Sequence, residues 1–196
     1  MNAFGRLFRV SILGESHGGS VGVLIDGCPA GLRLAPGDFA ADLGRRRPGR
    51  PGTTARREPD RPLIQSGLLD RRTTGAPILI TFKNQDARPD DYAGCAETPR
   101  PGHADFVALQ KYGGFADLRG GGHFSGRLTV GLVAAGVIAK KLIRPASVEA
   151  GLVRAGGTER IEDAVAAARE AGDSVGGIIE ARVRRVPAGQ IGRAHV

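Results

Sequence analysis

The stretch LFRVSILGESHGGSVGVLID, residues 7–26, decides the fold of this chain. Two short runs of apolar and β-branched residues, 7–13 and 21–26, stand on either side of a glycine-rich segment, 14–19. Strand-forming residues bounded by glycines predict a strand, a tight loop and a second strand. The loop also contains His17, so a candidate functional side chain lies between two predicted strands.

Further elements are predicted along the rest of the chain. A buried strand is expected over 77–82, and the alternation over 179–184 predicts a half-buried strand with one face toward water. The expected helices are 34–43, opening at Pro36; 104–112, ending at Gly113; a helix N-capped by Ser125 and running to Ile143, with close packing at Gly136; and 159–171, ending at Gly172. Because these elements do not follow a regular βαβ order, the sequence favours the α+β class.

Composition bounds the function classes. The chain has 196 residues and a net charge of +8, and only four of its 28 basic residues are lysines. An apolar fraction of 41% excludes a disordered or fibrous protein. The two cysteines argue against a disulfide scaffold, the N-terminus lacks a signal-peptide core, and the longest apolar run, 130–139, is about half a membrane span. We therefore expect a soluble, cytoplasmic protein of one or two domains.

The positive charge is concentrated in the segment Arg45–Arg61. It contains the seven arginines Arg45, Arg46, Arg47, Arg50, Arg56, Arg57 and Arg61. Guanidinium groups suit carboxylate and phosphate recognition, so the segment is compatible with a small polyanion or with nucleic acid. No aromatic residue interrupts it, which disfavours a single-strand stacking platform, and a solvated charged face is the alternative without function.

Histidines provide the candidate proton-transfer groups. His17 and His103 lie among glycines, which allow a ligand to approach closely, and an imidazole titrates near neutral pH. The alternative is that each ring only binds a loop carbonyl. No pair of histidine and cysteine has metal-ligand spacing, so no metal is expected.

A glycine triplet forms the third candidate feature. In the segment 119–127, three glycines lead toward the predicted helix and Arg119 and Arg127 flank them. Such a segment can turn amide N–H groups toward an anion at a helix start. A flexible linker is the alternative.

Together these motifs resemble the chorismate synthase family. The motifs appear in the family's order: Gly14-Glu15-Ser16-His17-Gly18, Arg45-Arg46-Arg47-Pro48-Gly49, Arg56-Arg57-Glu58-Pro59-Asp60, Thr73-Thr74-Gly75, Arg100-Pro101-Gly102-His103-Ala104-Asp105, Lys111-Tyr112-Gly113 and Arg119-Gly120-Gly121-Gly122. The resemblance is close over 4–143 and looser over 173–189. It implies a β-α-β sandwich of two similar halves, assembled as a homotetramer.

The resemblance also implies a reaction. Family members convert 5-enolpyruvylshikimate 3-phosphate to chorismate and phosphate by a 1,4-anti elimination, the last common step of the shikimate pathway. They require reduced FMN, and NADPH is a candidate reductant. A substrate with two carboxylates and a phosphate fits a site rich in arginine and poor in aromatic residues.

Site residues follow from the resemblance, position by position. His17 is implied as an acid near the leaving phosphate, and His103 as the residue that protonates or holds the reduced flavin. The residues implied to hold substrate anions are Arg46, Arg47, Arg50, Arg100, Arg119 and Arg127, although many relatives have one residue more in the segment around Arg50. His123, Phe124 and Ser125 match the stretch that contacts FMN.

The chain departs from the family in length. We expect residues 1–190 to be the N-terminal part of a single chorismate synthase domain, without the later half that supplies further flavin and acidic groups. Residues 191–196 match one reading frame of a sequencing-library adapter, which predicts a non-native tail. A chain lacking half of its fold is expected to expose an apolar face and open sheet edges, and to be catalytically inactive alone.

Overall fold

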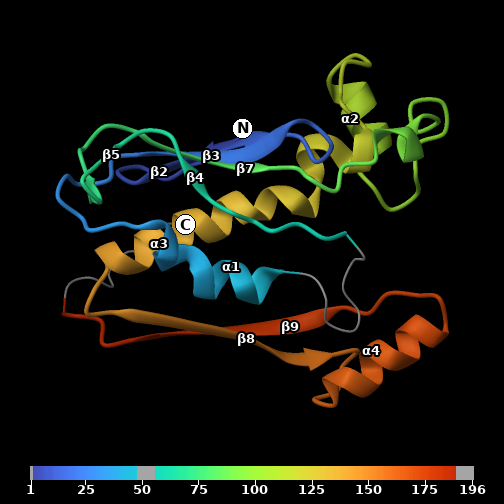
Figure 1. The fold of residues 1–196 in the computed structure, drawn as a ribbon. Helices are drawn as coiled ribbons and strands as arrows, with labels where there is room; N and C mark the ends of the chain where they lie inside the picture. The colour runs from blue at the N-terminus through green and yellow to red at the C-terminus, as the bar shows by residue number, and fades with distance from the viewer. Residues whose placement is uncertain (1, 48–55, 189–196) are drawn as a thin grey trace. The chain divides into compact units, whose positions relative to one another are not determined.

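The computed structural model describes residues 2–47 and 56–188 of the chain (Figure 1). These residues divide into two compact units. The first comprises the described residues up to Ile138, and the second begins at Ala139. Arg50 and the expected tail 191–196 lie outside the described residues.

The first unit is built on a five-stranded antiparallel sheet in the order β1-β2-β3-β7-β4. Its strands are β1 (Ala3–Phe4), β2 (Arg9–Gly14), β3 (Ser20–Asp26), β7 (Ile78–Lys83) and β4 (Leu63–Ile64). A separate two-stranded ladder pairs β5 (Leu68–Leu69) with β6 (Arg72–Thr73). The two strands predicted around the glycine loop, and the buried strand after Pro77, are therefore confirmed.

The core of the first unit lies on one face of this sheet. Alternate residues of β3 face the same side, and their cross-strand partners on β7 match them. The buried pairs are Val21 with Phe82, Val23 with Ile80 and Ile25 with Ile78. Register is therefore fixed, because a shift by one residue would turn every one of these side chains toward the other face.

Helical segments complete the first unit, and the last of them, α3, continues past the unit's end at Ile138. They are η1 (Pro36–Phe39), α1 (Ala40–Arg46), η2 (Pro89–Tyr92), α2 (Asp105–Lys111), η3 (Arg119–Phe124), η4 (Gly126–Leu128) and α3 (Thr129–Leu142). The expected cap at Ser125 is present, but its hydroxyl accepts from the Arg127 N–H at the start of η4, one turn before α3 begins. The close approach expected at Gly136 occurs instead at Gly131, where a Cβ would lie 2.9 Å from the Gly22 carbonyl oxygen.

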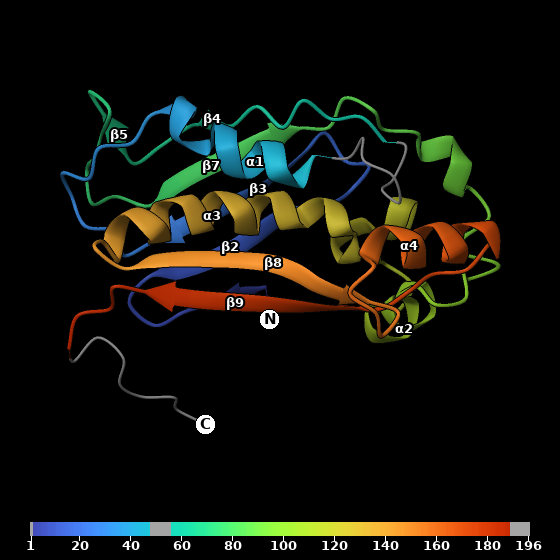
Figure 2. The same cartoon turned by 90° about the horizontal axis from the view of Figure 1, so that it is seen from below.

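The second unit contains one antiparallel strand pair and one helix. Strands β8 (Ser147–Ala155) and β9 (Gly177–Arg184) lie side by side, and α4 (Ile161–Glu170) connects them (Figure 2). The expected helix 159–171 is confirmed within two residues of its predicted ends. Strand β8 was not predicted, because it contains Gly151 and its pairing shifts register between Leu152 and Arg154, both of which weaken a strand pattern.

Cross-strand pairing in the second unit separates apolar from charged side chains. Val148 faces Val183 and Leu152 faces Ile179, whereas Glu149 faces Arg182 on the opposite side. The predicted half-buried β9 is wrong as regards burial, since every residue of β9 is exposed. The large apolar side chains of this strand pair are exposed, among them Ile179 at 71%.

Within the described ranges, no helix is long and apolar enough to cross a bilayer. In the same part of the chain, no group of three or more His, Cys, Asp or Glu side chains is arranged to hold a metal ion. Cys28 and Cys95 are both buried and both free.

Candidate active site

The site begins at the glycine loop between β2 and β3. The Asn84 side-chain amide, directly after β7, donates to the carbonyl oxygens of Glu15 at 3.1 Å and Gly18 at 2.8 Å. On the other side, the Ser16 N–H donates to the Gly122 carbonyl oxygen at 3.1 Å. The loop is therefore fastened both to the end of β7 and to the glycine triplet, which are distant in sequence.

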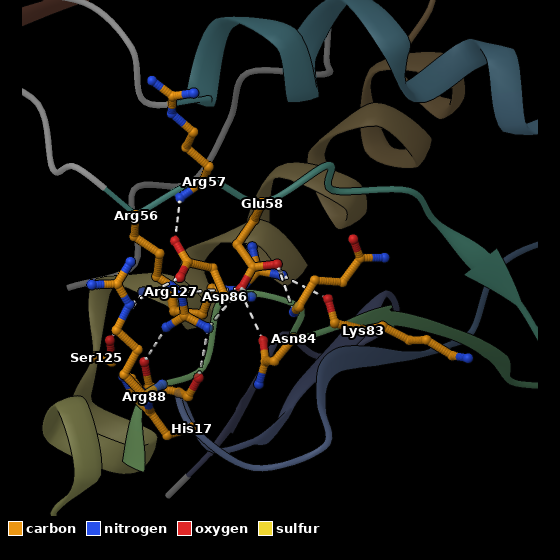
Figure 3. A network of polar contacts seen from close by, with 12 residues as sticks. His17, Arg56, Arg57, Glu58, Lys83, Asn84, Asp86, Arg88, Ser125 and Arg127 are labelled. Atoms are coloured by element: carbon orange, nitrogen blue, oxygen red, sulfur yellow. Dashed lines mark hydrogen bonds and ion pairs between the residues drawn. The ribbon is translucent and has the colours of Figure 1, made fainter. Parts of the chain in front are cut away.

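His17 is half-buried in this loop, where Figure 3 shows it beside Arg88. Three groups of the described residues lie around its ring. Nδ1 accepts a hydrogen bond from the backbone N–H of Arg88 at 2.9 Å. The Tyr92 ring meets it edge-on with 4.8 Å between centroids. Gly120 closes the third side, because a Cβ there would lie 2.4 Å from His17 Cδ2 and 2.5 Å from Nε2. Only glycine at position 120 leaves room for this imidazole.

The charges around His17 favour its neutral form. Burial is the main cause that lowers its pKa from the ordinary value, and the positive charges of Arg56 and Arg119 lower it further. Asp117 and Asp91 oppose this shift by smaller amounts. A neutral imidazole can donate a hydrogen bond to an anion or exchange a proton with it near neutral pH.

Glu58 organises one side of the site. Its side chain is 3% exposed, and Oε1 accepts from Arg56 Nε at 3.0 Å and Nη2 at 2.7 Å. The other donors of Arg56 reach Ser16, at the hydroxyl (2.8 Å) and the carbonyl oxygen (2.9 Å). Glu58 also accepts from the backbone N–H groups of Gln85 at 2.9 Å and Asp86 at 3.3 Å. One buried carboxylate thus links three segments of the chain.

Asp60 organises the other side. Its side chain is fully buried, and its two oxygens pair with Arg46 Nη1, at 2.8 Å, and with Arg127 Nη1. The Arg127 side chain is only 4% exposed and also donates from Nε to Asn84 Oδ1 at 3.0 Å. Arg46 donates to the carbonyl oxygens of Gly126 and Arg127 and to Thr129 Oγ1, and burial lowers its pKa. The three arginines 46, 56 and 127 against two carboxylates leave one net positive charge.

The other predicted arginines have different surroundings. Arg119 pairs bidentately with Asp117, and its side chain remains 46% exposed. Arg100 pairs bidentately with the buried Asp105 and lies over the Tyr92 ring at 5.1 Å. Arg47 is exposed and donates to the Pro59 carbonyl oxygen. Among these arginines, Arg119 and Arg47 are the ones best placed to meet a ligand from solvent.

The glycine triplet adopts a conformation that only glycine takes easily. Gly120, Gly121 and Gly122 have φ values of 59°, 82° and 53°. At Gly122 a Cβ would collide with the Asp117 carbonyl oxygen. The Gly121 and Ser125 amides donate to the carbonyl oxygens of Leu118 and Gly122, so these two N–H groups are not directed at an anion as the sequence suggested.

The three residues expected to contact FMN follow this triplet. Nδ1 of the half-buried His123 lies 3.0 Å from the Gly14 carbonyl oxygen, which makes Nδ1 the protonated nitrogen. Phe124 is 49% exposed, and its ring centroid lies 6.3 Å from that of Tyr112. Ser125 is held as the cap of η4.

His103 occupies a different environment from His17. It is exposed, and its backbone N–H donates to the Arg100 carbonyl oxygen at 3.4 Å. The backbone of His103 is bonded to Arg100, whose guanidinium lies over the Tyr92 ring that contacts His17, so the connection between the two histidines is indirect. The catalytic role of each histidine stays a prediction.

The residues that hold this site together have no individual role in the predictions from sequence, although four of them stand in the motifs quoted above. They are Ser16, Arg56, Glu58 and Asp60 from those motifs, and Asn84, Asp86, Arg88 and Tyr92 from the segment after β7. One signal was available: Glu58 and Asp60 are acidic residues within a segment of arginines, and such residues are placed there to pair with the arginines. The partners in 84–92 had no signal, because only the fold brings this loop beside His17.

The fold and the site define an α+β protein with a histidine held among arginine–carboxylate pairs. Comparison with known proteins then identifies it: the family model described as chorismate synthase matches residues 8–195, and the chain belongs to this family. The α+β expectation is confirmed by a solved crystal structure of a chorismate synthase. It matches with a TM-score of 0.69 and 23% identity, over 93% of this chain and 59% of that one.

The relatives that are similar in sequence are also chorismate synthases. The chorismate synthase of Chitinophaga pinensis is 59% identical over 190 residues, which cover 96% of this chain and 57% of the relative. Those of Syntrophobacter fumaroxidans and of a Synechococcus strain are each 46% identical, with 60% and 58% of the relative covered. The chain thus spans somewhat less than two thirds of the length of the curated relatives that it matches.

Proposed function

We propose that this chain supplies the histidine and arginine side of the active site of a chorismate synthase. The reaction is the elimination of phosphate from 5-enolpyruvylshikimate 3-phosphate: a carbon–oxygen bond to phosphate and a carbon–hydrogen bond break, and chorismate and phosphate leave. No net oxidation takes place. The proposal rests on the family membership and on one observation, the His17 ring held between the Arg88 N–H and Gly120, where the positive charges of Arg56 and Arg119 act on it.

This arrangement suits a leaving phosphate. The Arg119 guanidinium is partly exposed, and the Nε2 edge of His17 lies against Gly120. Cations and hydrogen-bond donors that are fixed before the reaction stabilise the charge that develops on a leaving group. Asp60 and Arg127 are buried and the partly exposed Arg46 pairs inward with Asp60, so we assign Arg46 and Arg127 to holding the site's shape and its positive potential.

The residues after the glycine triplet fit a flavin in part. Phe124 and Tyr112 are both exposed aromatic rings, which a planar isoalloxazine can contact, and His123 directs Nδ1 to Gly14, leaving Nε2 for a ligand. Reduced FMN, when bound, supplies electron density to the substrate during the elimination. His123, Phe124 and Ser125 would hold it, with His103 as the proposed proton donor from the neighbouring loop.

The same proposal includes the oligomeric state, the cellular compartment and the reductant. We expect a cytoplasmic homotetramer in the whole enzyme, with NADPH as a candidate reductant of the flavin. The chain alone is expected to be inactive, because it spans only 57% of its Chitinophaga pinensis relative.

Nucleic-acid binding through Arg45–Arg61 is the second candidate function. The described arginines Arg46 and Arg56 are directed inward to Asp60 and Glu58, so they do not form an exposed cationic strip. The family match also favours the enzyme. Binding of non-specific RNA that weakens steeply with salt would support this second candidate.

A chimera tests the proposed function. It joins residues 1–188 of this chain to the remaining C-terminal part of the Chitinophaga pinensis chorismate synthase. With reduced FMN we expect formation of chorismate and phosphate, and His17→Asn in the chimera is expected to lower kcat by about 10²–10⁴ fold. The parent enzyme is the control. A cooperatively folded chimera without turnover, beside an active parent, would overturn the proposal.

A further inference from the structure

The hydrogen bond at His17 Nδ1 fixes the protonation state of the ring. A backbone N–H can only donate, so the Arg88 N–H at 2.9 Å requires a free lone pair on Nδ1. An imidazolium has hydrogen on both nitrogens and cannot accept this bond. The proton of a neutral ring is therefore on Nε2, the edge next to Gly120.

The groups that face the ring agree with a neutral state. Arg56, from the segment after residue 55, and Arg119, at the start of η3, disfavour a second positive charge. Asp117, just before η3, and Asp91, in η2, favour it more weakly. Burial, together with the net effect of these four charges, keeps the pKa of His17 below its ordinary value.

Glu58 is connected to His17 first through the side chain of Arg56. Its Oε1 accepts two hydrogen bonds from Arg56, and Arg56 in turn holds both the hydroxyl and the carbonyl oxygen of Ser16. Ser16 directly precedes His17 in the loop. The carboxylate therefore fixes the backbone that carries the imidazole, although it does not touch the ring.

A second route from Glu58 runs through the backbone. Its carboxylate accepts the N–H groups of Gln85 and Asp86, in the irregular segment that leads to Arg88. The Asp86 side chain in turn accepts from Arg88 Nε at 3.3 Å and from the Arg57 N–H at 2.9 Å (Figure 3). The position of the Arg88 N–H thus depends on the same carboxylate as the position of Ser16.

We propose that Glu58 is a positioning residue that holds His17 as a neutral imidazole donating from Nε2. This inference deepens the proposed function at the same site. A neutral Nε2–H donor stabilises the departing phosphate by a hydrogen bond, as neutral imidazoles do for other developing anions. The compensating positive charge then comes from the arginines, and His17 needs no prior protonation.

Nitrogen NMR of the full chain with ¹⁵N-labelled histidine tests the tautomer. His17→Asn identifies the His17 signals among the four histidines. At about pH 7 we expect an unprotonated Nδ1 and a protonated Nε2. An imidazolium at that pH, or a protonated Nδ1, would overturn the proposal. The same label in the chimera gives this readout in a longer protein.

Amide hydrogen exchange at Arg88 tests the role of Glu58. Glu58→Gln keeps an acceptor for Arg56 but replaces the acceptor of the Gln85 or Asp86 N–H by an amide donor. We expect Arg88 exchange to rise about tenfold, which corresponds to the loss of one hydrogen bond. Asp60→Asn is the matched control, since it removes the second buried carboxylate of the site, which pairs with Arg46 and Arg127 and accepts from neither Arg56 nor these amides. We expect the protection of the Arg88 amide, relative to core amides of the same variant, to be kept.

If Glu58→Gln and Asp60→Asn change the amide exchange of Arg88 equally, or if neither changes it, the role of Glu58 is purely structural and the proposal is wrong. If Glu58→Gln fails to fold, Arg56→Lys is used in its place. This substitution removes the guanidinium that joins Glu58 to Ser16 and leaves the bonds from Gln85 and Asp86 to Glu58, so we expect a smaller rise in Arg88 exchange. No change in Arg88 exchange in Arg56→Lys would then overturn the proposal. These readouts need neither substrate nor flavin, so failure of the proposed function would leave them intact.

Discussion

The His17 ring lies directly against Gly120, where a Cβ would stand 2.4 Å from His17 Cδ2. Gly121 has a similar backbone, with φ of 82°, but its nearest neighbour, Ser125 Cβ, would be 3.8 Å away. Alanine at either position incurs a left-handed backbone penalty of about 1–2 kcal/mol. Only alanine at position 120 also displaces the imidazole.

We therefore expect Gly120→Ala and Gly121→Ala to lose similar stability and to differ at His17. In Gly120→Ala the His17 imidazole resonances shift and the Arg88 amide loses protection; in Gly121→Ala both stay as in the wild type. Proton–nitrogen spectra and chemical denaturation measure the two effects. Identical spectra for the two variants would contradict the contact.

Asp60 is expected to contribute strongly to stability. Its buried carboxylate pairs with Arg46 and Arg127, and Asp60→Asn leaves both cations without their counter-ion while asparagine still tolerates the φ of 47°. Breaking a buried pair costs about 3–5 kcal/mol. Urea denaturation measures the free energy of unfolding, and Asp163→Asn, at the exposed pair with Arg160, is the control with a much smaller loss.

His17 is expected to make stability depend on pH. Its pKa is lowered in the folded chain from 6.5, mainly by burial, so below that value the unfolded chain binds more protons. Stability is thus full above 6.5 and falls as the pH drops toward the folded pKa. Between about pH 7 and pH 5, His17→Asn is expected to show a smaller decline in the urea midpoint than the wild type. An equal decline of the urea midpoint in the two proteins would show that folding does not lower the pKa of His17.

Phe124 is expected to contribute to flavin binding in the chimera. Its exposed ring lies beside Tyr112, and an aromatic contact contributes about 0.5–1.5 kcal/mol, which is roughly tenfold in Kd at most. Phe124→Ala is compared with Phe115→Ala, which removes a ring that is 94% exposed. Flavin fluorescence titration is the measurement. Weaker binding in both variants alike would argue against a specific contact.

The exposed apolar face of β8 and β9 is expected to drive self-association of the chain alone. Ile179 is 71% exposed and faces Leu152 across the strands. In sedimentation velocity, Ile179→Lys is expected to shift the distribution of sedimentation coefficients toward that of the monomer, because a charge disfavours burial of this face. Ala166→Lys, which adds the same charge to exposed α4, is the control and is expected to leave association unchanged.

Local pattern determined most of the elements. Strands β2, β3 and β7 follow from apolar runs between glycines, and α4 follows from its periodicity and the glycine after it, because these signals act between near neighbours. The exposure of β9 could not be predicted in the same way. Its alternation is real, but whether an apolar face is covered depends on what packs against it.

The sequence by itself determined the family, the glycine loop that carries His17 and the arginine-rich composition of the site, since these depend on residue types at fixed spacing. Tertiary structure alone decided which charges meet. Glu58 accepts from Arg56 and from the 85–86 backbone, Asp60 joins Arg46 to Arg127, and the Arg88 N–H reaches His17 across 71 positions of sequence. Buried charges and donors require partners, and folding selects those partners by proximity in space, which residue spacing does not encode.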